Sequence, residues 1–158
     1  MKASRIIAVD PHVTKSGVAV IDVREKTVSV DAMTFPELMD YLGDIQDKES
    51  VSIAVEAGWL NFKSNFHGYY GRRGEKIAKD VGANHETGRK IVEMGEHMGF
   101  SISLVKTLTK RWSGANGKIT HPELESVLKG LKIGLNKKRT NQDERDSILI
   151  AIHQYNRL

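Results

Sequence analysis

The sequence predicts an α/β protein in which a five-stranded mixed sheet carries helices on both faces. Three β-branched apolar runs follow one another near the N-terminus, at distances that hairpins can connect. Two later apolar runs alternate with helical patterns, which is the arrangement of parallel strands joined by crossover helices. A chain of 158 residues can bury a core within one domain, so we expect residues 1–158 to form a single domain.

The N-terminal part of the chain contains the first four predicted strands and the first helix. Apolar, β-branched residues run or alternate over 5–10, 17–23, 27–33 and 51–56. Between the last two of these segments, apolar side chains recur at helical spacing, at Phe35, Leu38, Leu42 and Ile45. Pro36 suits the first turn of that helix, which we expect over 35–47. The first three strands should therefore form an antiparallel unit.

The C-terminal part alternates helices with one more strand. The expected elements are an irregular loop over 57–74, helices over 75–98, 121–131 and 142–156, and a fifth strand over 100–105. Thr120 fits the N-cap position of the middle helix, directly before the first turn that contains Pro122. Three hairpin strands followed by alternating helices and strands is the order of the RNase H-like fold.

Two glycines, Gly88 and Gly95, lie seven positions apart on one side of the long predicted helix. Glycine weakens an isolated helix, so its presence here indicates that another backbone or side chain approaches closely. Packing against the sheet of the same chain explains this spacing, and so does contact with a second subunit. The pattern leaves both interpretations open.

Composition and charge restrict the class of protein. The chain has no cysteine, which excludes disulfides and thiolate metal sites. No apolar stretch approaches the roughly 18 residues of a membrane span, and the N-terminus lacks the pattern of a signal peptide. We therefore expect a cytoplasmic protein that makes no membrane contact. A net charge of +4 and a pI near 9.3 are compatible with nucleic-acid binding.

Four carboxylates stand where a metal site could form. Asp10 ends the first predicted strand and Glu56 ends the fourth, and these strands can be neighbours in the sheet. Asp143 and Asp146 are three positions apart and so share one face of the last helix. Converging carboxylates repel one another unless a cation joins them, and hard oxygen ligands favour Mg²⁺ or Mn²⁺. Two such ions can clamp an in-line phosphoryl displacement.

Each acid also has an ordinary structural explanation. Asp10 can start a turn, and Glu56 can simply face solvent at a strand end. Asp143 in a first helical turn is favourable to the helix dipole, and Asn141 with Glu144 makes a capping box. Any single acid fits these structural roles better than catalysis. The joint pattern keeps metal binding open, with neither interpretation excluded.

Three segments of the sequence resemble a known family. The segments "IIAVDPHVTKSGVAVID", "SIAVE" and "QDERDSILIAIH" are similar, in order and spacing, to the acidic motifs of RuvC-type Holliday junction resolvases. The segment "VKTLTKRWSGANGK" followed by a helix extends the resemblance over most of the chain. Two departures stand out. His12 replaces the usual glycine after Asp-Pro, and "AGWLNF" follows Glu56 where the family has another form.

The resemblance implies a mechanism and a set of site residues. The implied catalytic residues are Asp10, Glu56, Asp143, Asp146, Lys110 and Lys118, of which the four acids would bind two Mg²⁺ or Mn²⁺ ions. Lys106 is the alternative to Lys110 beside the scissile phosphate. The implied protein is a homodimer that resolves four-way DNA junctions by paired nicks, with water as the nucleophile and no cofactor other than metal.

The loop after Glu56 mixes aromatic and basic residues. Its sequence "WLNFKSNFHGYYGRRG" suits unpaired bases, because rings stack on bases and cations contact phosphates. We expect Trp59 and Phe62 to anchor the loop on the sheet. The expected nucleic-acid contacts are Phe66, Tyr69, Tyr70, Lys63, Arg72, Arg73, Lys15, Lys137, Lys138 and Arg139. The six histidines show no ligand spacing, which argues against a histidine zinc site.

Three functions remain open at this point. The first is a metal-dependent endonuclease that cuts branched DNA, favoured by the paired acids of the last helix and the aromatic loop. The second is an RNA-processing nuclease of the same fold. The third is a protein that binds branched DNA without cutting it, which four intact acids argue against. An actin-like nucleotide-binding protein needs two lobes, and the chain is too short for them.

Overall fold

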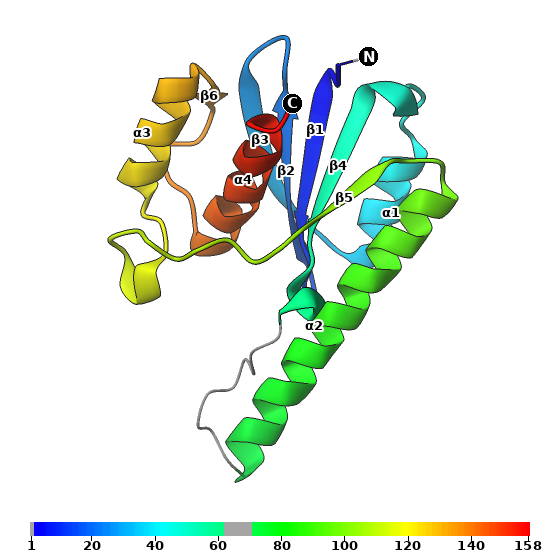
Figure 1. Cartoon of the computed structure of the whole chain (residues 1–158), viewed down its shortest axis with the longest axis vertical. Helices are drawn as coiled ribbons and strands as arrows, with labels where there is room; N and C mark the ends of the chain where they lie inside the picture. The colour runs from blue at the N-terminus through cyan, green and yellow to red at the C-terminus, as the bar shows by residue number, and fades with distance from the viewer. Residues whose placement is uncertain (1, 62–70) are drawn as a thin grey trace.

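The protein is built on a six-stranded mixed sheet with the strand order β5-β4-β1-β2-β3-β6 (Figure 1). We describe it from a computed structural model, which covers residues 2–61 and 71–158. The strands are β1 (Arg5–Asp10), β2 (Ser16–Asp22), β3 (Thr27–Met33), β4 (Val51–Glu56), β5 (Ile102–Val105) and β6 (Gly134–Leu135). The pairs β1–β2 and β2–β3 are antiparallel, whereas β1–β4, β4–β5 and β3–β6 are parallel.

The predicted mixed sheet of the RNase H-like fold is confirmed, but the number of strands is six rather than five. The additional strand, β6, has only two residues and pairs with Thr27 and Val28 at the edge of the sheet. Two residues are too few for an alternating hydrophobic pattern, so the sequence carries no signal for this strand. β5 begins at Ile102 instead of residue 100, because the Phe100 amide still donates to the Gly95 carbonyl at the end of the preceding helix.

Within the described residues four α-helices complete the fold: α1 (Phe35–Gly43), α2 (Gly71–His97), α3 (His121–Leu131) and α4 (Gln142–Tyr155). The cap at Thr120 and the capping box of Asn141 with Glu144 are confirmed. α1 ends at Gly43 rather than residue 47. α2 begins at Gly71, within the segment expected to be loop, and a 3₁₀ turn occupies Gly58–Leu60.

The helices cover both faces of the sheet, which accounts for the continuous apolar runs in β1 and β4. Figure 1 shows α3 and α4 on one side and α1 and α2 on the other. Within β1, Ile6 and Ala8 pack toward α4, whereas Ile7 and Val9 pack toward α1 and α2. All four side chains are fully buried. Each buried Ile or Leu contributes about 1.5–3 kcal/mol, so these layers hold the strand ends in place.

Gly88 and Gly95 of α2 allow close packing within the chain. A Cβ atom on Gly88 would lie 2.5 Å from the Trp59 ring, and one on Gly95 would lie 2.5 Å from Ile102 Cδ1. Packing against the chain's own sheet and the segment after β4 therefore explains both positions. Among the residues that the structure describes, no helix has the length and apolar character needed to cross a bilayer.

Candidate active site

Asp10 and Glu56 come together because β1 and β4 run parallel in matched register. Val9 pairs with Val55, so the next residues of the two strands, Asp10 and Glu56, lie side by side at the carboxyl ends of β1 and β4. Parallel strands with buried faces place whatever follows them at a common edge. The predicted convergence of these two acids is therefore a direct result of strand register.

The last helix brings Asp146 to the same place. Asp10, Glu56 and Asp146 line one cavity of about 190 Å³, which lies between the strand ends, α4 and the loop after β5. A Cβ atom on Gly17 of β2 would lie 3.2 Å from the Asp143 carbonyl oxygen, so glycine lets the first turn of α4 approach the sheet. This approach brings Asp143 near Asp10 as well, although Asp143 does not line the cavity.

The environment of Asp10 disfavours its negative charge. Burial, followed by repulsion from Glu56, Asp146 and Asp143, raises the pKa of Asp10 from 3.8 to about 8. Lys118 acts in the opposite direction but is the weakest of these influences. Like charges have thus been gathered at a poorly solvated point, which is what a cation-binding site requires of its carboxylates.

Glu56 shares this environment, but more neighbouring groups stabilise its ionised form. Burial is the largest cause of its raised pKa, and repulsion from Asp146 acts in the same direction. A hydrogen bond from Thr107 lowers the pKa of Glu56, as do the charges of Lys110 and Lys118. Two lysines therefore stand close enough to the acids to influence them.

The loop after β5 folds back on itself and brings Lys110 and Lys118 to the cavity wall. The Trp112 amide donates to the Gly117 carbonyl at 2.9 Å, and the Gly114 amide donates to the Lys118 carbonyl at 2.9 Å. Gly117 has a φ of +75°, and a Cβ atom there would lie 2.8 Å from the Lys110 carbonyl oxygen. Glycine is required for this turn. Lys106 does not line the cavity, so the geometry favours Lys110 over Lys106.

Two neutral side chains contact the acids directly and a third contacts them through one of these two; none of the three was predicted from the sequence. Thr107 Oγ1 donates to Glu56 Oε1 at 3.3 Å, and Asn61 Nδ2 donates to Thr107 Oγ1 at 3.0 Å. Gln142 Nε2 donates to Asp146 Oδ1 at 2.8 Å. Gln142 lies four positions before Asp146 on one helix, a spacing that could have been recognised. Thr107 shows no comparable local signal.

A second cavity, of about 230 Å³, reaches Asp10 and Glu56 from the α2 side of the sheet. Its walls include Asn61, Asn84 and His85. Burial and the charge of Arg89 lower the pKa of His85, which favours its neutral form. The acid pair is therefore open on two sides, one with lysines and one with uncharged polar groups.

His12 belongs to the turn between β1 and β2. Its amide donates to Ser16 Oγ at 3.1 Å, and its Nδ1 accepts from the Thr14 amide at 3.1 Å. His12 has no positive φ, so the turn does not need the conformational freedom of glycine. Its side chain is exposed and lines neither cavity beside Asp10, which agrees with a surface turn residue.

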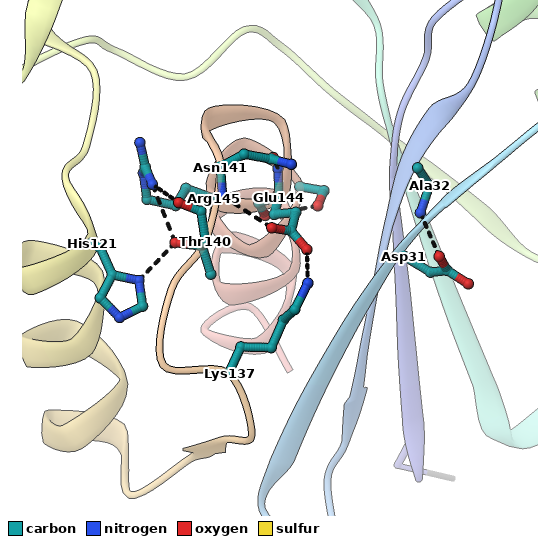
Figure 2. A network of polar contacts seen from close by, with 9 residues as sticks. Asp31, Ala32, His121, Lys137, Thr140, Asn141, Glu144 and Arg145 are labelled. Carbon is teal, nitrogen blue, oxygen red and sulfur yellow. Dashed lines mark hydrogen bonds and ion pairs between the residues drawn. The ribbon is translucent and has the colours of Figure 1, made fainter.

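Only some of the residues expected to contact nucleic acid lie within the part of the chain that the structure describes. Lys15, Arg72, Arg73, Lys138 and Arg139 are exposed. The exposed Lys137 forms an ion pair with Glu144 at the start of α4 (Figure 2). Phe66, Tyr69, Tyr70, Lys63 and Phe62 lie outside the described residues. Trp59 packs against the α2 side of the core, as expected of an anchor, and Arg89 lies over its ring at 5.6 Å.

The carboxylates fit a hard cation chemically but are not arranged around one. Within residues 2–61 and 71–158, no three His, Asp or Glu side chains form a group ready to hold a metal ion. The donor set of Asp10, Glu56 and Asp146 nevertheless matches Mg²⁺ or Mn²⁺, because a cation would relieve the repulsion that raises the pKa of Asp10. Metal binding by these acids stays a prediction.

The strand order and the helices on both faces define an RNase H-like fold. Two solved structures from Thermus thermophilus are similar to the whole chain. RuvC in complex with a Holliday junction substrate matches with a TM-score of 0.56 and 13% identity, over 97% of this chain and 94% of that chain. A second RuvC structure matches with a TM-score of 0.54 and 15% identity, over 97% of this chain and 95% of the other.

The chain therefore has the fold of a RuvC-type Holliday junction resolvase. No protein-family model and no curated protein matches the sequence. At this level of identity the likeness concerns the fold.

Proposed function

We propose that this protein is a metal-dependent, structure-selective endonuclease that resolves four-way or other branched DNA junctions by paired nicks. The observation that carries the proposal is the environment of Asp10. It is half-buried close to Glu56, Asp146 and Asp143, with its pKa raised to about 8, and Lys110 and Lys118 line the same cavity. Acids and lysines in one cleft match the needs of phosphodiester hydrolysis, where cations bind the acids and lysines bind the phosphate.

In this proposal Asp10, Glu56, Asp143 and Asp146 hold two Mg²⁺ ions, or Mn²⁺ in their place. Ions held by these acids would supply Lewis-acid chemistry, which lowers the pKa of an attacking water and offsets the charge on the leaving 3′-oxygen. Lys110 and Lys118 bind the non-bridging oxygens of the scissile phosphate and offset the negative charge that grows on them. The products are a 5′-phosphate and a 3′-hydroxyl.

The proposed substrate also needs a wider basic surface and two active sites. The phosphates of the junction arms would be contacted by the exposed cations Lys15, Arg72, Arg73, Lys138 and Arg139. Lys137 would also contact a phosphate, after giving up its ion pair with Glu144. Lys63 and the aromatic residues Phe66, Tyr69 and Tyr70 would contact unpaired bases. A four-way junction presents two symmetry-related strands, so we propose that a homodimer places one active site on each.

The deciding experiment compares a synthetic four-way DNA junction with linear duplex DNA and with structured RNA. Each is incubated with Mg²⁺ or with a chelator. We expect paired nicks in the junction only when Mg²⁺ is present, and none with Asp143→Asn. Asp40→Asn, the same change on the exposed face of α1, is the matched control and should nick normally.

The other outcomes separate the alternatives. Cleavage of RNA in preference to the junction would point to an RNA-processing nuclease. Tight junction binding without any nicking in Mg²⁺ or Mn²⁺ would point to a binding protein. Activity that survives both Asp10→Asn and Glu56→Gln would contradict the metal mechanism.

A further inference from the structure

The carboxylate of Asp146 is held by a chain of hydrogen bonds that begins one helical turn earlier. Gln142 Nε2 donates to Asp146 Oδ1 at 2.8 Å, and Arg145 Nη2 donates to Gln142 Oε1 at 3.1 Å. A guanidinium can only donate and a carboxylate can only accept. The Gln142 amide must therefore turn its oxygen to Arg145 and its nitrogen to Asp146. Reversing the amide would lose both bonds.

Arg145 is itself fixed by acceptors outside α4. Its Nε donates to the Ile119 carbonyl at 3.0 Å. Its Nη1 donates to the Thr140 carbonyl and to Thr140 Oγ1, and Figure 2 shows Arg145 beside Thr140. These acceptors are neutral, and their positions fix the direction of the guanidinium, while the charge of Glu144 also attracts it. Ile119 follows the loop that carries Lys118. Arg145 thus ties the start of α4 to the loop that forms the other wall of the cavity.

The chain of contacts continues into α3. Thr140 Oγ1 lies 2.7 Å from His121 Nδ1, and His121 occupies the first position of α3 (Figure 2). Thr140 therefore contacts Arg145 on one side and His121 on the other. Arg145 is thus held by the segment before α3 and by the residue that precedes the α4 cap, and Gln142 is the partner through which its printed bonds in the described part of the chain reach a site acid.

We propose that Gln142 and Arg145 are positioning residues for Asp146: Arg145 orients the Gln142 amide, and that amide holds one carboxylate oxygen so that the other is available to a divalent cation. The inference rests on the proposed function, because it assigns Asp146 to metal binding. Residues that hydrogen-bond to metal ligands orient them, and removing such a residue typically weakens metal affinity or activity about 10- to 100-fold. A simple stabilising pair on a helix surface predicts no such loss.

The test measures Mn²⁺ binding to the DNA-free protein by the electron paramagnetic resonance signal of the free ion. Gln142→Ala should weaken Mn²⁺ binding about tenfold. Arg145→Lys keeps the charge but lacks the planar guanidinium, so it should orient the Gln142 amide less well. We expect it to weaken Mn²⁺ binding, but by less than Gln142→Ala does. The matched control is Glu144→Gln, which weakens the capping box and the ion pair with Lys137 but leaves Asp146 untouched. Its Mn²⁺ affinity should equal that of the wild type.

Junction nicking gives a second, independent readout. The Mg²⁺ concentration for half-maximal nicking by Gln142→Ala should rise about tenfold. The rate at saturating Mg²⁺ and the affinity for the junction in chelator should change little. The thermal midpoints of all variants are measured alongside, since general loosening of α4 would lower affinity for a different reason.

Wild-type Mn²⁺ affinity in a folded Gln142→Ala variant would overturn the inference while leaving the proposed function intact. Equal losses in Gln142→Ala and Glu144→Gln would also overturn it, because both would then reflect a disturbed helix start. A wild-type protein that neither binds Mn²⁺ nor nicks the junction would instead contradict the proposed function itself.

Discussion

Asp10 and Glu56 end neighbouring parallel strands, and the partial burial of Asp10 together with repulsion from Glu56 and Asp146 makes its ionised form unfavourable. The folded-state pKa of Asp10 is about 8, above its ordinary value of 3.8. The fold therefore favours protonated Asp10. The resulting stability is fully present below pH 4 and is lost progressively as the pH rises toward 8.

Asp10→Asn should accordingly stabilise the metal-free protein near neutral pH. The neutral amide removes the repulsion, and we expect a gain on the order of 2 kcal/mol in the free energy of unfolding at pH 8. At pH 4 the gain should nearly vanish. Urea unfolding of both proteins across this range measures the difference. A constant difference at all pH values would contradict the assignment, and Asp40→Asn controls for charge removal in general.

Thr107→Val should impair the site through Glu56. The Thr107 hydroxyl lowers the pKa of Glu56, so its removal should raise that pKa further. Less ionised Glu56 means weaker cation binding at low pH, and the acidic limb of the pH–rate profile for nicking should move to higher pH. Several-fold slower nicking at the acidic end of the profile, with recovery as the pH rises, is the expected result.

Thr109→Val is the matched control for this change. Thr109 lies in the same loop and lines the same cavity, but Glu56 accepts its hydrogen bond from Thr107. The pH–rate profile of Thr109→Val should therefore overlay that of the wild type. Equal displacement of both profiles would mean that the loop as a whole, rather than the Thr107 bond, sets the pKa of Glu56.

Two glycines of α2 should respond in opposite directions to the same substitution. Gly88→Ala places a methyl group 2.5 Å from the Trp59 ring and should cost about 1–3 kcal/mol. A Cβ atom on Gly82 would meet nothing within 4 Å, so Gly82→Ala should gain about 0.5–1 kcal/mol from helix propensity. Denaturant unfolding checks both values. Destabilisation by Gly82→Ala would indicate that this face of α2 contacts another molecule.

Lys110→Met and Lys106→Met should separate the two lysines that the sequence could not distinguish. Lys110 lines the cavity of the acids and lowers the pKa of Glu56, whereas Lys106 does neither. Removing a group that stabilises transition-state charge typically slows catalysis about 10²- to 10³-fold. We expect this loss in single-turnover nicking by Lys110→Met and nearly normal rates with Lys106→Met. The reverse order would reassign the phosphate contact to Lys106.

Local patterns in the sequence predicted most of the elements and several of the important side chains. Asp10 and Glu56 were correctly predicted to stand at strand ends, because each follows an apolar run. The hydrophobic pattern of a strand and the point where it stops can both be read from a few residues. The caps at Thr120 and Asn141 were predictable for the same reason. β6 was missed because two residues carry no period, and α2 begins at Gly71 despite a glycine-rich first turn.

The environment of the site was decided only by the tertiary structure. Whether Lys110 or Lys106 reaches the acids depends on how the loop folds back at Gly117. No local sequence pattern predicts that loop conformation. The bonds from Thr107 to Glu56 and from Arg145 to Ile119 likewise join distant segments. The sequence by itself determined which acids stand at the ends of elements. The charge and burial that set their pKa values are sums over neighbours in space, and only the folded chain supplies those neighbours.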